Sequence, residues 1–307
     1  MAESDQGGTF ASLRYQAFRH LWLGQIFHAG AVWMSQIALP FLIFDLTGDR
    51  AAHLGAVIGV RTIPQVFFGL IAGVVTDWFD RRTVLMTVKL AVFSLSVAFA
   101  GLILSGLLEL WHVYIYAFLR GILMAFDQPA RQSMVPSIVP AARVTNAMAL
   151  MSATLNTMRI AGATMGGLVY ASMGAEGAFS IMAGLYAGAA WFTYLLRVPT
   201  QQKPEGTGLA AMGRGLVDGL RFALGSASVR GVLGLSAIYF TFGMSYMQVF
   251  LPLFAEEVLE IGSGGYGVMS AFTGAGALTM AMLIARHEPQ RLGLLLQMIV
   301  AGFGLSI

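Results

Sequence analysis

The chain has 307 residues, of which 57% are hydrophobic and only 11% are charged, and it contains no Cys. This composition excludes an ordinary water-soluble domain, a disordered chain and a disulfide scaffold, because none of these accommodates so much apolar sequence. The formal net charge of +3 is small and scattered, so it does not indicate nucleic-acid binding.

Apolar runs that are long enough to cross a bilayer recur along the chain. A transmembrane helix needs about 20 apolar residues, and we predict eight such helices and an incomplete ninth. The runs are 21–44, 54–76, 83–108, 110–126, 146–173, 178–196, 231–254, 265–285 and 292–307. A buried soluble helix explains any single run, but not eight in succession. The sequence therefore predicts an all-α, multi-pass membrane protein.

Basic residues indicate the orientation of these helices. If the N-terminus lies inside, the cytoplasmic segments hold 13 of the 18 Lys and Arg residues, and the outer loops hold one, Arg50. Cytoplasmic loops carry this excess of basic residues in membrane proteins. We therefore expect a cytoplasmic N-terminus.

A polar segment divides the predicted helices into two groups. We expect an N-terminal six-helix bundle over 1–196, a cytoplasmic linker over 197–230 and an incomplete C-terminal bundle over 231–307. Leucines at helical spacing predict an amphipathic helix within the linker, and accidental periodicity is the alternative. Two equal halves would need roughly 400 residues. We expect an incomplete sequence, about nine helices of twelve, and a functional short form is the alternative.

The segment between the second and third runs, residues 73–82, reads Gly-Val-Val-Thr-Asp-Trp-Phe-Asp-Arg-Arg. It resembles the loop signature of the major facilitator superfamily: a glycine, an aspartate four positions later and a basic pair. Trp78 and Asp80 depart from that pattern, and a basic pair alone would be only a membrane anchor. In that superfamily, charge contacts of this loop latch the inward-closed state. The resemblance implies a conformational latch formed by Gly73, Asp77, Arg81 and Arg82 of this loop. The segment around 125–131 extends the latch with Asp127 and Arg131.

Other stretches resemble one branch of this superfamily, the enterobactin-exporter-like and macrolide-efflux-like transporters. They are residues 18–25, 46–48, 125–131, 135–147 and 218–222. The resemblance implies a major facilitator fold with a six-helix N-terminal half and an incomplete C-terminal half. It also implies secondary active transport by alternating access in a bacterial cytoplasmic (inner) membrane.

The fifth run contains the segment 159–167, Arg-Ile-Ala-Gly-Ala-Thr-Met-Gly-Gly. It is similar to the antiporter signature of the superfamily, in which a glycine–proline pair precedes two glycines; here Ala163 replaces the proline. The resemblance implies a close-packed helix that favours export, with helix-packing roles for Gly162, Gly166 and Gly167.

The predicted spans contain several basic groups and, by these boundaries, no Asp or Glu. Buried cations in lipid normally face a cavity or a partner, so we expect cavity roles for Arg120, Arg159, His28 and Gln25. The alternatives are a structural arginine bonded to backbone carbonyls or Asp127, and a packing histidine. His28 is also a candidate proton-coupling group, and Asp127 and Asp45 are alternatives to it. We expect Lys89 and Arg61 to extend toward a membrane interface.

The sequence contains no phosphate-binding loop and no metal or cofactor cluster, so ATP-driven transport and enzyme activity are not indicated. The predicted function is proton-coupled export of small hydrophobic, amphiphilic or anionic molecules. An importer and a non-transporting membrane protein are the alternatives. We expect a monomer whose partners are a small-molecule substrate, the lipid bilayer and candidate coupling protons, with no nucleic acid, no cofactor and no metal.

Overall fold

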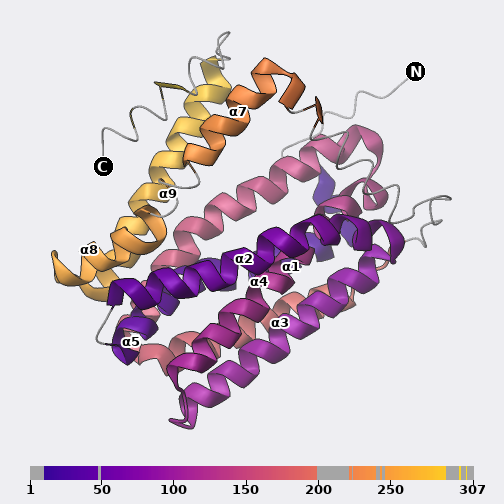
Figure 1. The fold of residues 1–307 in the computed structure, drawn as a ribbon. Helices are drawn as coiled ribbons and strands as arrows, with labels where there is room; N and C mark the ends of the chain where they lie inside the picture. The colour runs from indigo at the N-terminus through magenta and orange to yellow at the C-terminus, as the bar shows by residue number, and fades with distance from the viewer. Residues whose placement is uncertain are drawn as a thin grey trace, which may run out of the picture.

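The computed structural model describes residues 10–47, 50–198, 221–222, 224–239, 243, 246–287, 297–298 and 302. The regular elements among these residues are all helical, which confirms the predicted all-α class (Figure 1). The long helices are α1 (Gln16–Leu46), α2 (Arg50–Trp78), α3 (Arg81–Leu104), α4 (Leu110–Ile138), α5 (Val144–Tyr194) and α9 (Gly262–His287). The shorter ones are η1 (Ala11–Arg14), η2 (Ala141–Arg143), α7 (Ala227–Ile238), the π-helical η4 (Tyr246–Phe250) and α8 (Leu251–Glu257).

Helix α5 contains both the fifth and the sixth predicted runs. Its chain turns at Gly174, where φ is +63°, a left-handed conformation that glycine adopts without a Cβ penalty. The first portion runs parallel to α1, because Gly162 meets Gly30 and Gly166 meets Met34. The second portion runs back along α1. The helices α1 to α5 therefore correspond to the first six predicted runs.

Three of the described helical stretches are long and apolar enough to cross a membrane by length and composition. They are α1, α3 and the continuous stretch Ala141–Tyr194 that contains α5. The seventh predicted run corresponds to α7, η4 and α8 in succession, and the eighth corresponds to α9. Most of the ninth run and of the predicted linker helix lies outside the described residues.

Helix α4 is longer than its predicted span. The run was expected to end at 126, where charged residues and Pro129 interrupt the apolar sequence, but the helix continues to Ile138. This boundary was wrong because ion pairs, rather than water, neutralise the charges that follow. Asp127 and Arg131 consequently lie inside a helix, on buried positions.

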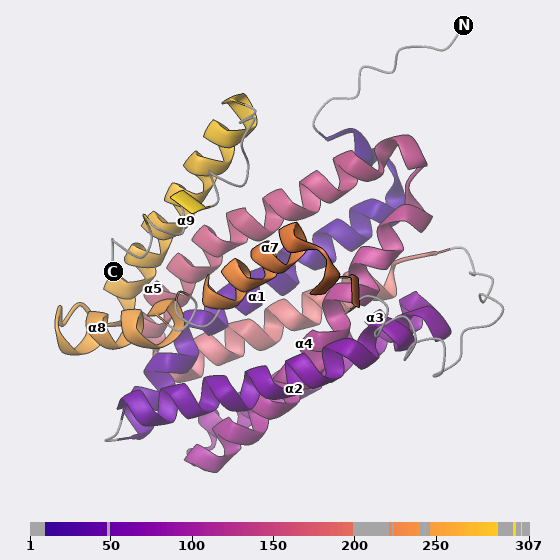
Figure 2. The same cartoon turned by 45° about the horizontal axis from the view of Figure 1, so that its top comes forward.

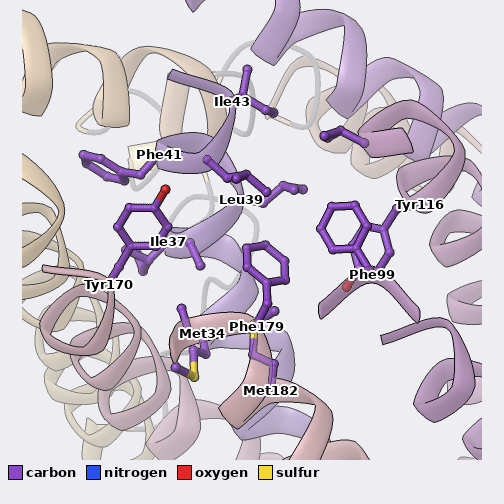
Figure 3. Close-up of a cluster of buried hydrophobic side chains, with 14 of the residues drawn as sticks. Met34, Ile37, Leu39, Phe41, Ile43, Phe99, Tyr116, Tyr170, Phe179 and Met182 are labelled. Carbon is purple, nitrogen blue, oxygen red and sulfur yellow. The ribbon is translucent and has the colours of Figure 1, made fainter. Parts of the chain in front are cut away.

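Helix α1 lies at the centre of the bundle and is buried on most of its length. Its C-terminal half packs against α3, α4 and α5 through a cluster of large apolar and aromatic side chains (Figure 3). Phe99 and Tyr116 stack with ring centroids 4.1 Å apart, and Phe179 meets the Phe99 ring edge-on at 5.1 Å. Burial of such aromatic side chains accounts for much of the packing between these helices.

The three glycines of the segment 159–167 lie at two helix crossings. A Cβ on Gly162 would approach the Gly30 carbonyl oxygen to 3.0 Å, and one on Gly166 would approach the Met34 backbone to 2.9 Å. Gly167 faces the other way, where a Cβ would come 3.0 Å from Cα of Gly267 on α9. Small residues allow this close approach of helices in lipid.

Helices α7, α8 and α9 lie on one side of the α1–α5 bundle (Figures 1 and 2). Helix α9 packs along the first portion of α5, where Gly167 and Gly267 meet, and α8 packs against α9. The described C-terminal helices therefore contact the bundle chiefly through α5.

Replacing Gly166 with Ala is expected to destabilise the protein by about 1–3 kcal/mol, because the new methyl group overlaps the Met34 backbone. Gly184→Ala is the matched control on the same helix, since a Cβ there meets nothing within 4 Å. Thermal unfolding in detergent, followed by size-exclusion chromatography, measures both variants. Equal midpoints for the two variants would contradict the close crossing.

Candidate functional site

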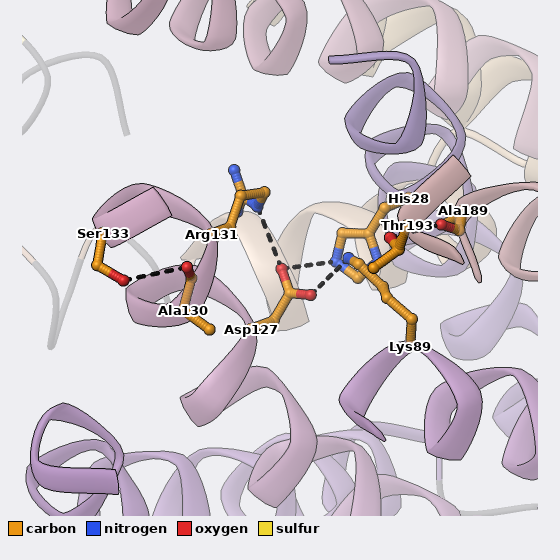
Figure 4. A network of polar contacts seen from close by, with 8 residues as sticks. All are labelled: His28, Lys89, Asp127, Ala130, Arg131, Ser133, Ala189 and Thr193. Carbon is orange, nitrogen blue, oxygen red and sulfur yellow. Dashed lines mark hydrogen bonds and ion pairs between the residues drawn. The ribbon is translucent and has the colours of Figure 1, made fainter. Parts of the chain in front are cut away.

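A buried carboxylate organises the interior of the bundle. Asp127 on α4 accepts a hydrogen bond from Lys89 Nζ on α3 at 2.5 Å and one from Arg131 Nε at 3.3 Å (Figure 4). His28 Nε2 on α1 lies 3.4 Å from the same carboxylate. All four side chains are less than one-tenth exposed. The network thus joins three helices around one negative charge.

Two expectations about these residues were wrong. Lys89 does not extend to an interface, because its side chain is 2% exposed and pairs with Asp127. An acidic residue does occupy a buried position within a long helix, namely Asp127 in α4. Its spacing from Arg131, four residues along the helix, could have signalled this pairing in the sequence.

A second group of buried polar side chains adjoins this network. The Arg120 guanidinium on α4 lies 4.8 Å from the centre of the Tyr186 ring, and the His28 ring lies 5.7 Å from it. Nη1 of Arg120, Nδ1 of His28 and both side-chain polar atoms of Gln25 are buried without a hydrogen-bond partner among the described residues. The structure therefore gathers three of the four predicted cavity residues inside the six-helix bundle.

The fourth predicted cavity residue, Arg159, lies in a different place. It lines a pocket between the bundle and the C-terminal helices, with its guanidinium 5.0 Å from the centre of the Trp33 ring. The pocket encloses about 780 Å³, counting its open side. Residues of α1, α2 and α5 form one wall, and residues of η4, α8 and α9 form the other. Arg120 is not among its lining residues.

The same pocket contains a second charged residue, which was expected to extend toward a membrane interface. Arg61 on α2 donates to Gln36 Oε1 on α1 at 3.0 Å and to Gln248 Oε1 on η4 at 2.6 Å. Its expected extension toward an interface was wrong, since two amide oxygens hold it in the pocket wall. Gly121 on α4 faces the Arg61 backbone carbonyl so closely that a Cβ would collide with it.

Four of the six predicted latch residues, Gly73, Asp77, Arg81 and Arg82, lie around the start of α3, whereas Asp127 and Arg131 belong to the buried network. Asp80 caps α3 by accepting from the Thr83 backbone N–H at 2.8 Å. Arg81 donates to the Ser133 carbonyl on α4 at 2.8 Å, and Arg82 donates to the Tyr194 carbonyl on α5 at 3.0 Å. Gly73 lies in open space on α2, and the Asp77 side chain is outside the described set. Both arginines thus bind within the bundle.

Replacing Asp127 with Asn is expected to destabilise the protein by about 3–5 kcal/mol, because Lys89 and Arg131 then lose their buried counter-charge. Pairing it with Lys89→Gln should recover part of that loss. The measurement is the thermal midpoint in detergent for both variants. Asp80→Asn is the control, because it removes a carboxylate on the surface. If the thermal midpoint of Asp80→Asn falls as far as that of Asp127→Asn, burial of the Asp127 charge has no special role.

Comparison with known proteins identifies the family. A family model described as a transmembrane secretion effector matches residues 7–303. The staphyloferrin A transporter of Staphylococcus aureus is 24% identical over 255 residues, which cover 83% of this chain and 63% of that protein. The multidrug efflux pump Tap of Mycolicibacterium fortuitum is 27% identical over 280 residues, which cover 88% and 68%. The chain thus spans about two thirds of the length of these relatives.

A solved structure supports the fold independently. The crystal structure of the POT family transporter PepTSo matches with a TM-score of 0.52 at 16% identity, over 86% of this chain and 52% of that one. At this identity the match supports the fold alone. The chain belongs to the transmembrane secretion effector family of the major facilitator superfamily, whose members are multi-pass membrane transporters and not enzymes.

Proposed function

We propose that this protein is a secondary active transporter that exports small amphiphilic, anionic molecules by proton antiport. The observation that carries the proposal is the pocket between the α1–α5 bundle and the C-terminal helices. Alternating access in this fold rocks two groups of helices around a site between them. A pocket with one wall from each group of helices is where a bound substrate would be exposed to each side of the membrane in turn.

The lining of this pocket favours a particular class of substrate. Arg61 and Arg159 supply two guanidinium groups, and Trp33 and Tyr266 supply aromatic surface. Among the described residues, the lining contains no Asp or Glu. Guanidinium groups bind carboxylates and phosphates, while the aromatic rings accept the apolar part of an amphiphile. The pocket therefore suits an organic anion better than an organic cation.

The names of the relatives are compatible with this proposal. One is a multidrug efflux pump and another is a staphyloferrin A transporter. The similarity to the antiporter signature at 159–167 also favours export. The excess of basic residues predicts a cytoplasmic N-terminus, in a bacterial inner membrane. In this proposal residues 197–230 form the cytoplasmic linker between the bundles 1–196 and 231–307, and the protein acts as a monomer.

A hydrogen-bonded bridge from the Arg61 guanidinium to two uncharged amides supports the alternating-access part of the proposal. Arg61 joins Gln36 of α1 to Gln248 of η4, so it connects the two walls of the pocket. We assign it the role of a gate that is closed in this conformation and parts when the pocket opens on that side. The latch at the opposite end, with Arg81 and Arg82, would then hold α3, α4 and α5 together.

Proton coupling is assigned to the buried network around Asp127. His28 is the group in it with an ordinary pKa near neutrality, and it lies within 3.4 Å of the carboxylate. Arg120 and the Gln25 amide have buried polar atoms with no hydrogen-bond partner among the described residues. A change in the charge of His28 would therefore change the balance of a network that joins α1, α3 and α4.

Replacing Arg159 with Gln is expected to weaken binding of anionic amphiphiles about tenfold, because one charge-assisted contact is lost. Binding to the purified protein and uptake into proteoliposomes, with a panel of fluorescent anionic and cationic amphiphiles, measure the effect. Arg230→Gln is the matched control, since Arg230 is exposed and lies outside the pocket. An equal loss of binding for cationic and anionic compounds would reject anionic amphiphiles as the substrate class.

The direction of transport is tested in membrane vesicles. Export predicts that everted vesicles accumulate the substrate and right-side-out vesicles do not. The reverse pattern would identify an importer, and accumulation in neither would support a non-transporting membrane protein.

Replacing His28 with Ala is expected to uncouple transport from the proton gradient, with substrate binding to the Arg159 pocket retained. Substrate-induced proton release from energised proteoliposomes measures the coupling. His53→Ala is the control, because His53 bonds to Tyr114 outside the network. Proton release that survives in His28→Ala would transfer the coupling role to Asp127 or Asp45.

A further inference from the structure

A second pocket lies at the end of the bundle where α1 and α3 begin and α5 ends. It encloses about 720 Å³, counting its open side. No function above uses this pocket as a binding site. Its walls come from α1, α3, the end of α5 and the residues just after it, and are formed by Gln16, His20, Arg82, Tyr194, Leu195 and Arg197.

The pocket is basic and has unused hydrogen-bond donors. None of the described residues that line it is acidic, and two of them are arginines. Arg82 Nη2 donates to the Tyr194 carbonyl at 3.0 Å, and His20 Nδ1 lies 3.1 Å from the Leu195 carbonyl. These contacts fix both side chains at the end of α5. Arg82 Nε is buried and has no hydrogen-bond partner within the described part of the chain.

The surface beside the pocket has the character of a membrane interface. Trp191 and Tyr194 are each 59% exposed, and their rings lie 6.0 Å apart. Exposed Trp and Tyr side chains mark the level of lipid headgroups in membrane proteins. Farther from the pocket, α3 exposes Leu90 and Val97, and α5 exposes Gly184. An apolar surface therefore leads from the pocket toward the middle of the bundle.

We propose that this pocket binds the phosphate group of an anionic phospholipid, whose acyl chains lie along the exposed faces of α3 and α5. Two guanidinium groups recognise a phosphate diester by charge-assisted hydrogen bonds. Basic pockets between membrane helices bind anionic lipid headgroups in this way. The aromatic pair and the apolar surface distinguish a lipid from a free phosphate, because a soluble anion would gain nothing from them.

The test uses the absence of Cys, which allows one introduced cysteine to carry a single fluorophore. Gly184→Cys places the label on the proposed acyl-chain surface, where an added side chain meets no neighbour within 4 Å. The labelled protein is reconstituted in phosphatidylcholine nanodiscs with rising fractions of brominated phosphatidylglycerol or brominated phosphatidylcholine. Bromine quenches the fluorophore only at close range. Phosphatidylglycerol is expected to quench at a mole fraction at least about fivefold lower.

Removing a pocket charge should remove this preference. Arg82→Gln and Arg197→Gln are each expected to reduce the selectivity about fivefold. Arg19→Gln is the control, because Arg19 is exposed on α1 beside the pocket but does not line it. If Arg82→Gln does not fold, Arg197→Gln still tests the proposal. Arg197 is exposed and lies just after the end of α5, so its replacement removes no buried contact.

Three outcomes would overturn the proposal. One is equal quenching by the two brominated lipids, and another is an equal loss of selectivity in Arg19→Gln, which would show only a general surface charge. The third is displacement of phosphatidylglycerol by millimolar glycerol phosphate, which would assign the pocket to a soluble phosphate. Quenching that is selective, dependent on Arg82 or Arg197 and insensitive to glycerol phosphate supports a lipid site.

Discussion

The ion pairs of Asp127 are the constraint on which the helix bundle depends. A lone charge within a membrane helix costs several kcal/mol, yet α3, α4 and α1 bring Lys89, Asp127, Arg131 and His28 to one point. Each charge is tolerated there because the others are present. The position of α3 relative to α4 is therefore specified by electrostatics as well as by packing. Apolar contacts alone would allow the two helices to slide, since lipid and leucine are almost equivalent surroundings.

Around this fixed point, glycines decide how closely the other helices approach. Gly162 and Gly166 bring the first portion of α5 against α1, and the return of the chain at Gly174 places its second portion against α1 as well. Helix α1 is thus held from two sides by one continuous segment. Gly167 faces outward and meets α9 instead. The same short stretch of sequence therefore builds the interior of the bundle and its contact with the C-terminal helices.

The fold was largely predictable, because apolar runs of membrane length are a strong signal of transmembrane helices. The motif resemblance in addition indicated which helix of the major facilitator fold each run corresponds to. The site was less predictable. The end of α4 was placed too early because Asp127 and Pro129 resemble a loop when their partners are unknown. Arg61 was misjudged for a similar reason: its partner Gln248 lies 187 positions away in the chain. Periodicity and composition report local surroundings, whereas the neutralisation of a buried charge depends on distant residues.

The predicted cavity residues divide between two places. Gln25, His28 and Arg120 lie buried inside the bundle, as expected for residues that face an interior, but Arg159 faces a separate pocket.

The chemistry of the Gln36–Arg61–Gln248 bridge has a kinetic consequence. Both acceptors are uncharged amides, so parting the two walls does not strand a carboxylate in an apolar interior. A neutral hydrogen bond contributes about 1 kcal/mol net, and one to a charged group about 1.5–3 kcal/mol, whereas breaking a buried ion pair costs about 3–5 kcal/mol. With Glu in place of Gln248, which lies on the opposite wall from Arg61, the closed form would be held far longer. Amide acceptors thus give a contact that is specific enough to set the register of the walls and weak enough to open by thermal motion.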